Sequence, residues 1–240
     1  MKREGAPCED DSRQVSSMAE HQTDPSAVGT LRYLQVPAMP RWKRLMDIFG
    51  SLLGLVVFSP LFLIVAIFIK ATSRGPVFFR QQRAGYLGQP FTIWKFRTMV
   101  VGIDTGIHEQ HVKELLKSEK PLYKLDCDEH LIPFGKWLRK LCIDELPQLI
   151  NVLGGSVSLV GPRPDVVAKE QYPLWQQQRF DVHPGITGLW QVSGKNSTTH
   201  ERMVQLDIAY ASQRSMLLDI KILLKTLPVI AGQMINKSTS

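Results

Sequence analysis

A charge-free run of 22 residues, Ile48–Ile69, constrains the fold of this chain more than any other stretch. With a rise of about 1.5 Å per residue, a helix of this length can cross a hydrocarbon core of about 30 Å. Ser59 and Pro60 lie at its centre. The proline removes the backbone hydrogen bond to the carbonyl of Val56, and its ring crowds that oxygen. Because the serine hydroxyl can satisfy a freed carbonyl, the sequence predicts an apolar helix that bends sharply at Pro60.

Basic residues flank both ends of the apolar run. Because such residues favour the cytoplasmic side of a membrane, both ends are predicted to lie on that side. This bias favours a helix over about residues 44–72 that enters the membrane, breaks at Pro60 and returns, and a straight span with a mild kink is the alternative. The basic residues before the run are Arg41, Lys43 and Arg44, and those after it are Lys70, Arg74, Arg80 and Arg83.

The charge balance and the cysteines restrict the partners and the compartment. The chain has 29 basic and 22 acidic residues, and the net charge of +7 points to an anionic partner such as lipid head groups, nucleic acid or nucleotide phosphates. The three cysteines, Cys8, Cys127 and Cys142, form no Cys-x-x-Cys pair, which is typical of a reducing cytoplasm. For Cys142, a buried position on a helix is favoured over a role as a thiol nucleophile.

The domain organisation is a polar tail followed by one domain. Residues 1–40 mix Glu, Asp, Ser, Gln and Pro with few large apolar residues, so they cannot bury enough surface to offset the entropy of ordering them. This tail is predicted to be mostly disordered and, lacking an apolar core, is not a secretory signal peptide. Residues 41–240 are predicted to form a single membrane-associated catalytic domain.

Acidic, basic, glycine and proline residues are densest between residues 143 and 164, which predicts an active site there. Asp144 is expected to cap the start of a helix, with Glu145 in its first turn. The free N–H groups and partial positive charge of a helix start favour an anion such as phosphate. The helix is expected to end at Gly154-Gly155, because glycine tolerates the left-handed conformation of a C-terminal cap.

The second half of this stretch carries a basic residue in a stiff turn. A short apolar segment, Val157–Val160, leads into Gly161-Pro-Arg-Pro164. The two prolines restrict the backbone around Arg163. From such a turn Arg163 can bind a phosphate with two guanidinium nitrogens at once.

The segment from Gly75 to Met99 predicts a β-hairpin with a basic end. Val77–Phe79 and Phe91–Trp94 are interpreted as strands on either side of a stretch rich in turn residues. The two-residue period of a strand places Lys95 and Arg97 on the same face, where they could jointly neutralise a diphosphate. A solvated basic edge is the alternative interpretation.

Two further segments bear on membrane and metal binding. Apolar residues at Phe134, Trp137 and Leu138 follow helical spacing with basic residues between them, which predicts an amphipathic helix at the membrane surface. His108 and His111 lack the spacing of an H-E-x-x-H zinc motif, so no metal is assigned to them.

The C-terminal third is predicted to contain a helix over Asp165–Asp181 and then a glycine-rich loop, Pro184–Lys195. In this loop Trp190 could stack on a nucleotide base beside Gln191, and a buried structural tryptophan is an equal alternative.

Thr199–Gln213 and Met216–Ile235 are predicted to be helices, the second interrupted at Pro228. The second helix suits the membrane interface, although core packing would produce the same pattern.

Several of these motifs together resemble the signature of a known family. Asp144-Glu-Leu-Pro-Gln148 followed by Ser158-Leu-Val-Gly-Pro-Arg-Pro164 resembles the bacterial sugar transferases, the monotopic polyprenyl-phosphate phosphoglycosyltransferases. Lys95–Met99 and Pro184–Gly194 extend the resemblance, which covers the chain from about Arg41 to about Leu227. It implies an α+β, mainly helical fold: a membrane-embedded re-entrant helix broken at the Ser-Pro pair, amphipathic interfacial helices and a small β-hairpin.

The resemblance also implies an activity. A sugar 1-phosphate would pass from a UDP-sugar to polyprenyl (undecaprenyl) phosphate, giving polyprenyl-diphosphate-sugar and UMP, as the first membrane step of a surface glycan or exopolysaccharide pathway. Asp144 would attack the sugar-bearing phosphorus to give a phosphosugar-aspartate. Glu145 would hold Mg²⁺ against the diphosphate, and Arg139 and Arg163 would offset charge on the phosphate oxygens.

The same resemblance places Asp207 and Tyr210 in a motif that supports the active site. The expected partners are a UDP-sugar, polyprenyl phosphate and membrane lipids, and the expected location is the cytoplasmic face of a bacterial inner membrane. The sequence does not specify the sugar, the glycan or the oligomeric state.

Two alternatives to this activity stay open at the level of sequence. The first is direct transfer without a covalent intermediate, with Asp144 as a base or a metal ligand. The second is a non-enzymatic basic membrane scaffold or nucleic-acid binder. No nucleic-acid-binding motif is present, so no nucleic-acid partner is expected.

Overall fold

The computed structural model describes residues 38–102, 106, 110, 112–114, 128–194 and 199–235. The predictions for residues 1–37, for Cys8 and Cys127, and for His108 and His111 therefore lie outside the described residues. The described part is mainly helical and contains a small antiparallel hairpin, which confirms the predicted α+β class.

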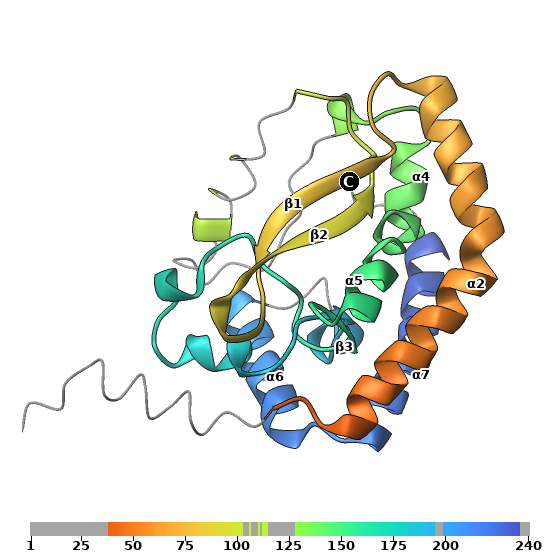
Figure 1. The fold of residues 1–240 in the computed structure, drawn as a ribbon. Helices are drawn as coiled ribbons and strands as arrows, with labels where there is room; N and C mark the ends of the chain where they lie inside the picture. Colours follow the sequence, from red (N-terminus) through yellow and green to blue (C-terminus); the bar gives the residue numbers. More distant parts are fainter. Residues whose placement is uncertain are drawn as a thin grey trace, which may run out of the picture. The chain divides into compact units, whose positions relative to one another are not determined.

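The long apolar run forms a single helix with a bend. Helix α2 (Arg41–Thr72) has 32 residues and continues through Pro60. The Ser59 hydroxyl donates to the Val56 carbonyl at 2.8 Å, so the predicted partner of the freed carbonyl is confirmed. Figure 1 shows α2 bent near its middle, with its two halves turned toward the same side of the molecule. By length and composition α2 could cross a membrane, and most of its apolar surface is exposed.

Both ends of α2 are held by the same domain. At the N-terminal end, the Arg44 guanidinium donates to two carbonyls at the C-terminus of helix α5 (Gln148–Gly154), at 2.7 Å each. At the C-terminal end, the Arg97 guanidinium donates to the carbonyls of Ser73 and Arg74, at 3.0 and 2.7 Å. A straight helix of this length would separate its ends by about 48 Å. The bend at Pro60 therefore allows both ends to contact one body.

The predicted hairpin is confirmed and is longer than expected. Strands β1 (Phe78–Ala84) and β2 (Pro90–Phe96) pair antiparallel around a tight turn at Tyr86–Gly88. Asn151 of α5 docks on the outer edge of β2, accepting from the Trp94 amide at 3.0 Å and donating to the Thr92 carbonyl at 2.8 Å. These bonds hold the hairpin against α5.

The segment with the acidic pair departs from the predicted helix start. Helix α4 (Gly135–Lys140) is followed by a single 3-10 turn, η3 (Ile143–Glu145), and α5 begins three residues later. Cys142, at φ +55°, turns the chain between α4 and η3. Asp144 is therefore not the cap of α5, and the prediction of a helix start there was wrong. The predicted glycine end is confirmed, because Gly155 has φ +86° directly after α5.

The strand after α5 carries the chain into the Gly-Pro-Arg-Pro loop. Strand β3 (Ser158–Val160) pairs in parallel with β4 (Gly185–Thr187), and the loop lies directly beyond β3. Gly161 approaches the partner segment so closely that a Cβ there would lie 2.4 Å from the His183 carbonyl. Only glycine fits such a crossing without movement of the backbone.

The predicted helix over Asp165–Asp181 was wrong. This stretch holds two short 3-10 segments, η4 (Lys169–Gln171) and η5 (Gln176–Asp181). Pro173 lies between them, and the residue before a proline is disfavoured in helical conformation.

The two C-terminal helices are confirmed. Helix α6 (His200–Gln213) begins after Thr199, whose hydroxyl accepts from the Arg202 amide. Helix α7 (Met216–Ile235) continues through Pro228 without the predicted interruption.

A buried ionic network ties the start of α2 to α6, α7 and β3. The Lys43 ammonium donates to the Asp219 carboxylate at 2.6 Å, to the Tyr210 hydroxyl at 3.0 Å and to the Val160 carbonyl at 2.9 Å. Tyr210 donates in turn to the second oxygen of Asp219 at 2.7 Å. We call Lys43, Tyr210 and Asp219 the anchoring cluster. One turn on, Asp47 accepts from the hydroxyl of Ser158 and from the next amide of β3.

Candidate active site

The acidic pair lies where three separate segments converge. Glu145 of η3 accepts from the Lys95 ammonium of β2 at 2.8 Å. It also accepts from both terminal nitrogens of Arg163, which reaches it from the loop after β3; one of these bonds is 3.1 Å long. Lys95 and Arg163, predicted to bind phosphate, are thus brought to the same carboxylate.

Glu145 is ionised and neutralised from two sides. Burial alone would raise its pKa, but the charges of Arg163 and Lys95, and their hydrogen bonds, hold the pKa of Glu145 well below its usual range. Burial lowers the pKa of Lys95, whereas the charge of Glu145 opposes that shift. The fork of Arg163 on Glu145 is the bidentate geometry that also suits phosphate.

Asp144 lies beside this neutralised group and has no comparable partner. It is 9% exposed, and its carboxylate has no hydrogen bond within the part of the chain that the structure describes. Burial and the neighbouring charge of Glu145 raise the pKa of Asp144 to about 6, against the opposing charges of Lys95, Arg163 and Arg139. A carboxylate without hydrogen bonds keeps its lone pairs available for a substrate.

The family resemblance implies that Arg139 binds phosphate, whereas its local sequence alone favours a lipid head-group contact; it lies in the last turn of α4. Its side chain is exposed, and its charge lowers the pKa of Asp144. The structure therefore places Arg139 close enough to act on the carboxylate without an ion pair between them.

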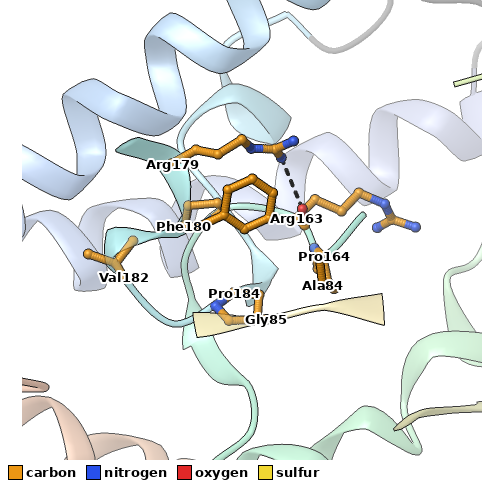
Figure 2. Close-up of a pocket in the computed structure, with 9 residues that line it drawn as sticks. Ala84, Gly85, Arg163, Pro164, Arg179, Phe180, Val182 and Pro184 are labelled. Carbon is orange, nitrogen blue, oxygen red and sulfur yellow. Dashed lines mark hydrogen bonds between the residues drawn. The ribbon is translucent and has the colours of Figure 1, made fainter. Parts of the chain in front are cut away.

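The backbone of Arg163 is held from behind. Figure 2 shows the Arg179 guanidinium donating to the Arg163 carbonyl, while the side chain of Arg163 extends away from Arg179. The distance of this bond is 3.0 Å. Arg179 also pairs with Asp207 of α6 at 2.9 Å and with Asp165 at 3.4 Å. Asp207 is thus linked to the loop that carries Arg163 through Arg179.

A small pocket lies behind this loop. Pro162, Arg163 and Pro164 line one side of it, and Phe180 and Val182 line another. Figure 2 shows Ala84, the last residue of β1, and Gly85 after it lining the pocket next to Pro184. The hairpin therefore packs directly on the loop that carries Arg163.

Two residues predicted for the site, Arg97 and Tyr210, lie elsewhere. Arg97 is 4% exposed and directs its guanidinium to the carbonyls at the end of α2, so it does not share a phosphate-binding face with Lys95. The reason is that β2 ends at Phe96, after which the strand alternation no longer applies. Tyr210 belongs to the anchoring cluster, where it contacts the Val160 carbonyl.

Trp190 and Gln191 are also buried. Trp190 is 5% exposed and packs with Met203 and Val204 of α6. The structure therefore favours the interpretation of Trp190 as a buried structural tryptophan over its stacking on a nucleotide base. Gln191 donates to the Ile186 carbonyl at 3.4 Å and is 8% exposed.

Sequence reasoning missed Arg83 as a site residue and counted it only as a charge flanking the apolar run. The cross-strand register pairs Phe79 with Lys95 and Arg83 with Phe91. Because every second residue of a strand shares a face, Arg83 lies on the same face of the hairpin as Lys95. The two-residue period of β1 was the signal that could have identified it.

The acidic residues present fit a Mg²⁺ ion only together with a substrate. Among the described residues, no group of three or more His, Cys, Asp or Glu side chains could hold a metal. Mg²⁺, however, is commonly bound by one or two carboxylates with substrate phosphates completing its shell. Asp144 and Glu145 supply that number.

Comparison with known proteins agrees with these motifs. A model of the family described as bacterial sugar transferase matches residues 39–233. Galactosyl transferase CpsE of Streptococcus agalactiae is 43% identical over 196 residues, which cover 78% of this chain and 42% of that protein.

Two further relatives differ in how much of their length is matched. Exopolysaccharide production protein ExoY of Sinorhizobium fredii is 38% identical over 78% of this chain and 84% of its own length. A UDP-glucose:undecaprenyl-phosphate glucose-1-phosphate transferase of Klebsiella pneumoniae is 40% identical over 82% of this chain and 41% of its own. The chain thus spans less than half of CpsE and of the Klebsiella protein, and most of ExoY.

Proposed function

The chain belongs to the bacterial sugar transferase family, and from that premise we propose that it transfers a sugar 1-phosphate from a UDP-sugar to polyprenyl phosphate at a membrane surface. The names of relatives as a UDP-glucose:undecaprenyl-phosphate glucose-1-phosphate transferase and an undecaprenyl-phosphate galactose phosphotransferase support the substrate class. One observation carries the proposal. Asp144 has a carboxylate without hydrogen bonds among the described residues, and it lies next to Glu145, whose charge Lys95 and Arg163 already neutralise.

The reaction proceeds in two displacements at phosphorus. An Asp144 oxygen forms a bond to the sugar-bearing phosphorus, and the bond from that phosphorus to the bridging oxygen breaks. The bridging oxygen leaves with the electron pair as part of UMP. In the second step an oxygen of polyprenyl phosphate attacks the same phosphorus, and the Asp144 carboxylate is released with its electron pair.

The surrounding cations make this approach feasible. Two adjacent carboxylates would repel an anionic phosphate. Lys95 and Arg163 cancel the charge of Glu145, and Arg139 adds positive potential at Asp144. When the donor binds, the two terminal nitrogens of Arg163 can move from Glu145 to phosphate oxygens, since a carboxylate and a phosphate can each accept two hydrogen bonds from one guanidinium.

Mg²⁺ is part of the proposal and would be held by Glu145 together with the donor diphosphate. Its chemical contribution is to offset charge on the diphosphate oxygens. Asp144 remains the group that forms the covalent bond.

The location of the site at a membrane rests on α2 and α4. Exposed apolar residues cover much of α2, and Phe134 and Trp137 are about 60% exposed at α4. Phe134 packs edge-to-face on Phe68 near the end of α2, with ring centroids 4.7 Å apart. We infer that α2 enters the cytoplasmic leaflet and returns, with Trp137 at the interface. This arrangement lets the site face one soluble and one membrane-bound substrate.

A labelled donor tests the covalent step. A UDP-sugar carrying radiolabel in the sugar-linked phosphate is incubated with enzyme in the absence of acceptor. Label should remain on the protein after denaturation and appear with about one equivalent of UMP, and added polyprenyl phosphate should remove it. Asp144→Asn is the control that should take up no label. Full turnover by the wild-type enzyme without any labelled protein would support direct transfer instead.

Metal removal tests the role of Mg²⁺. A chelator should stop UMP release, and added Mg²⁺ should restore it. Glu145→Gln should raise the Mg²⁺ concentration needed for half-maximal rate as well as lower the rate. A wild-type enzyme that works equally well in excess chelator would exclude the metal role.

A further inference from the structure

Arg83 is a largely buried cation next to the active site, and the described residues supply no counter-ion within ion-pair distance of it. One terminal nitrogen donates to the Gln81 side-chain oxygen at 2.7 Å, and the other reaches the Pro164 carbonyl at 3.4 Å. Its Nε atom is buried without a hydrogen-bond partner. No carboxylate lies within ion-pair distance of it among the residues that the structure describes. Buried charges are ordinarily paired, so this arrangement is unusual.

The carboxylate whose charge acts most strongly on Arg83, Asp165, is engaged elsewhere. Asp165 accepts from the Tyr172 hydroxyl and from the Val166 amide, at 2.7 Å each. It also pairs with Arg179 at 3.4 Å, which completes the network behind the loop. The charge of Asp165 raises the pKa of Arg83, but desolvation prevails and lowers that pKa to about 10. The positive charge of the Arg83 guanidinium is thus only partly offset by the side chains that the structure describes.

The position of Arg83 places it beside Arg163. The amide of Ala84, the next residue of β1, donates to the Asp165 carbonyl at 2.9 Å, which pins this end of the strand to the loop. Ala84 faces the pocket behind the loop (Figure 2), and neighbouring residues of a strand point to opposite faces. Arg83 therefore lies on the side of the hairpin that faces Glu145, and the charges of Arg163 and Glu145 both act on it.

We propose that Arg83 binds the phosphate of the departing nucleotide, the one next to the nucleoside. The inference rests on the proposed function, because it assigns one phosphate of the donor to Arg83 and leaves the other to Arg163 and Asp144. As the bond to the bridging oxygen breaks, negative charge develops on the nucleoside monophosphate, and a guanidinium at this position stabilises it. The ligand class is a nucleoside mono- or diphosphate.

The first test compares two arginines of β1. Arg83→Met should raise the inhibition constant of UMP by about 10- to 100-fold, the range for losing hydrogen bonds to a charged group. Inhibition by uridine, which lacks the phosphate, should not change. Arg80→Met is the matched control, since Arg80 lies on the opposite face of the strand and stacks on Trp94 at 4.0 Å. It should leave UMP inhibition at the wild-type value.

The second variant supplies the missing counter-ion and leaves Arg83 in place. Gln81→Glu changes the hydrogen-bonded partner of Arg83 into a carboxylate of the same shape. We expect the melting temperature to hold or rise, while the inhibition constant of UMP rises at least fivefold. A purely structural role of Arg83 would not move stability and nucleotide binding in opposite directions.

The half-reactions separate binding from general damage. With Arg83→Lys, which keeps the charge but loses the fork, UMP release from the donor should slow. Transfer of sugar phosphate from the preformed intermediate to polyprenyl phosphate should keep its rate, because UMP has already left. Equal slowing of both steps, or unchanged UMP inhibition in both Arg83→Lys and Gln81→Glu, would overturn the assignment. A wild-type chain that turns over no UDP-sugar but still binds UMP through Arg83 would refute the proposed function alone.

Discussion

The anchoring cluster and the active-site cluster use the same types of residue for opposite purposes. In the anchoring cluster the side chains of Lys43 and Asp219 are 2% and 0% exposed, and Tyr210 satisfies both of them. In the active site the side chains of Lys95 and Glu145 are 16% and 13% exposed, at nearly the same separation of 2.8 Å. The active site additionally contains Asp144, a carboxylate that forms no ion pair with any side chain in the described part of the chain.

The difference lies in whether every charge has a partner within the protein. A fully buried ion pair such as Lys43–Asp219 is sensitive to substitution, because removing one member leaves the charge of the other buried without a partner. A cluster with one unpartnered carboxylate and one doubly neutralised carboxylate is less stable than it could be, and it is ready to react with an anion. Variants of the two clusters should therefore separate stability from activity.

The largest effect is expected for Asp144→Asn. Turnover should fall by about a hundredfold or more, because the variant lacks the nucleophilic oxygen and its charge. The melting temperature should hold or rise, since burial and Glu145 make the ionised Asp144 unfavourable in the folded state. Both quantities are measured on the same detergent-solubilised preparation. Residual activity of more than a few per cent would show that Asp144 is not the nucleophile.

Lys43→Met should reverse this pattern. We expect a loss of about 3–5 kcal/mol in the free energy of unfolding, because Asp219 is left buried without its cation. Lys95→Met is the matched variant of the active-site cluster, and it should destabilise less, since Arg163 still binds Glu145, while turnover falls. Denaturant unfolding and UMP release measure the two effects. Equal destabilisation by both variants would remove the distinction between the clusters.

Replacing both members of the buried pair tests whether the loss of stability comes from an unpaired charge. In Lys43→Met with Asp219→Leu, both charges are absent, so most of the lost stability should return. If the double variant is as unstable as Lys43→Met, the pair is not the source of the stabilisation.

Straightening α2 tests whether anchoring depends on the bend. In the double variant Ser59→Leu, Pro60→Leu the helix can regain continuous backbone hydrogen bonding. A straight helix cannot keep both Lys43 at its start and the carbonyls of Ser73 and Arg74 at its end in contact with the same domain. We expect mixed topology and reduced activity. A cysteine placed at Arg32, with Cys8, Cys127 and Cys142 replaced, should be shielded from external labelling in the parent and labelled in part of the variant population. Labelling in the parent would mean that α2 spans the membrane.

The smallest effect is a pH dependence of the active-site cluster. In the proposed mechanism Asp144 reacts as the carboxylate. Its pKa is raised to about 6, so the rate should halve near pH 6 and fall about tenfold for each further unit of acidification. Protonation of a group with a raised pKa favours the folded state, so this group should cause no loss of stability over the same range. The measurement is UMP release without acceptor, because an acceptor phosphate itself titrates near pH 6. A flat profile between pH 5 and 8 would contradict the raised pKa.

Features that depend on neighbouring residues were determined by the sequence itself. Pro60 removes the backbone hydrogen bond to the Val56 carbonyl whatever the helix packs against. The hydroxyl of Ser59 can reach the same carbonyl. The hairpin and the left-handed Gly155 follow from local backbone preferences in the same way. The motif indicated the right family because Glu145 and Arg163, which are hydrogen-bonded to each other, are only 18 residues apart in the chain.

The partners of long charged side chains were decided by the tertiary structure. Lys43 and Asp219 are 176 residues apart, and nothing near either one indicates the other. Arg97 and Arg83 lie on the same hairpin, yet one binds the carbonyls at the end of α2 and the other reaches the active-site loop. A long flexible side chain can reach several groups within its radius. Which groups lie there depends on how helices and strands pack, and that packing is a property of the whole domain.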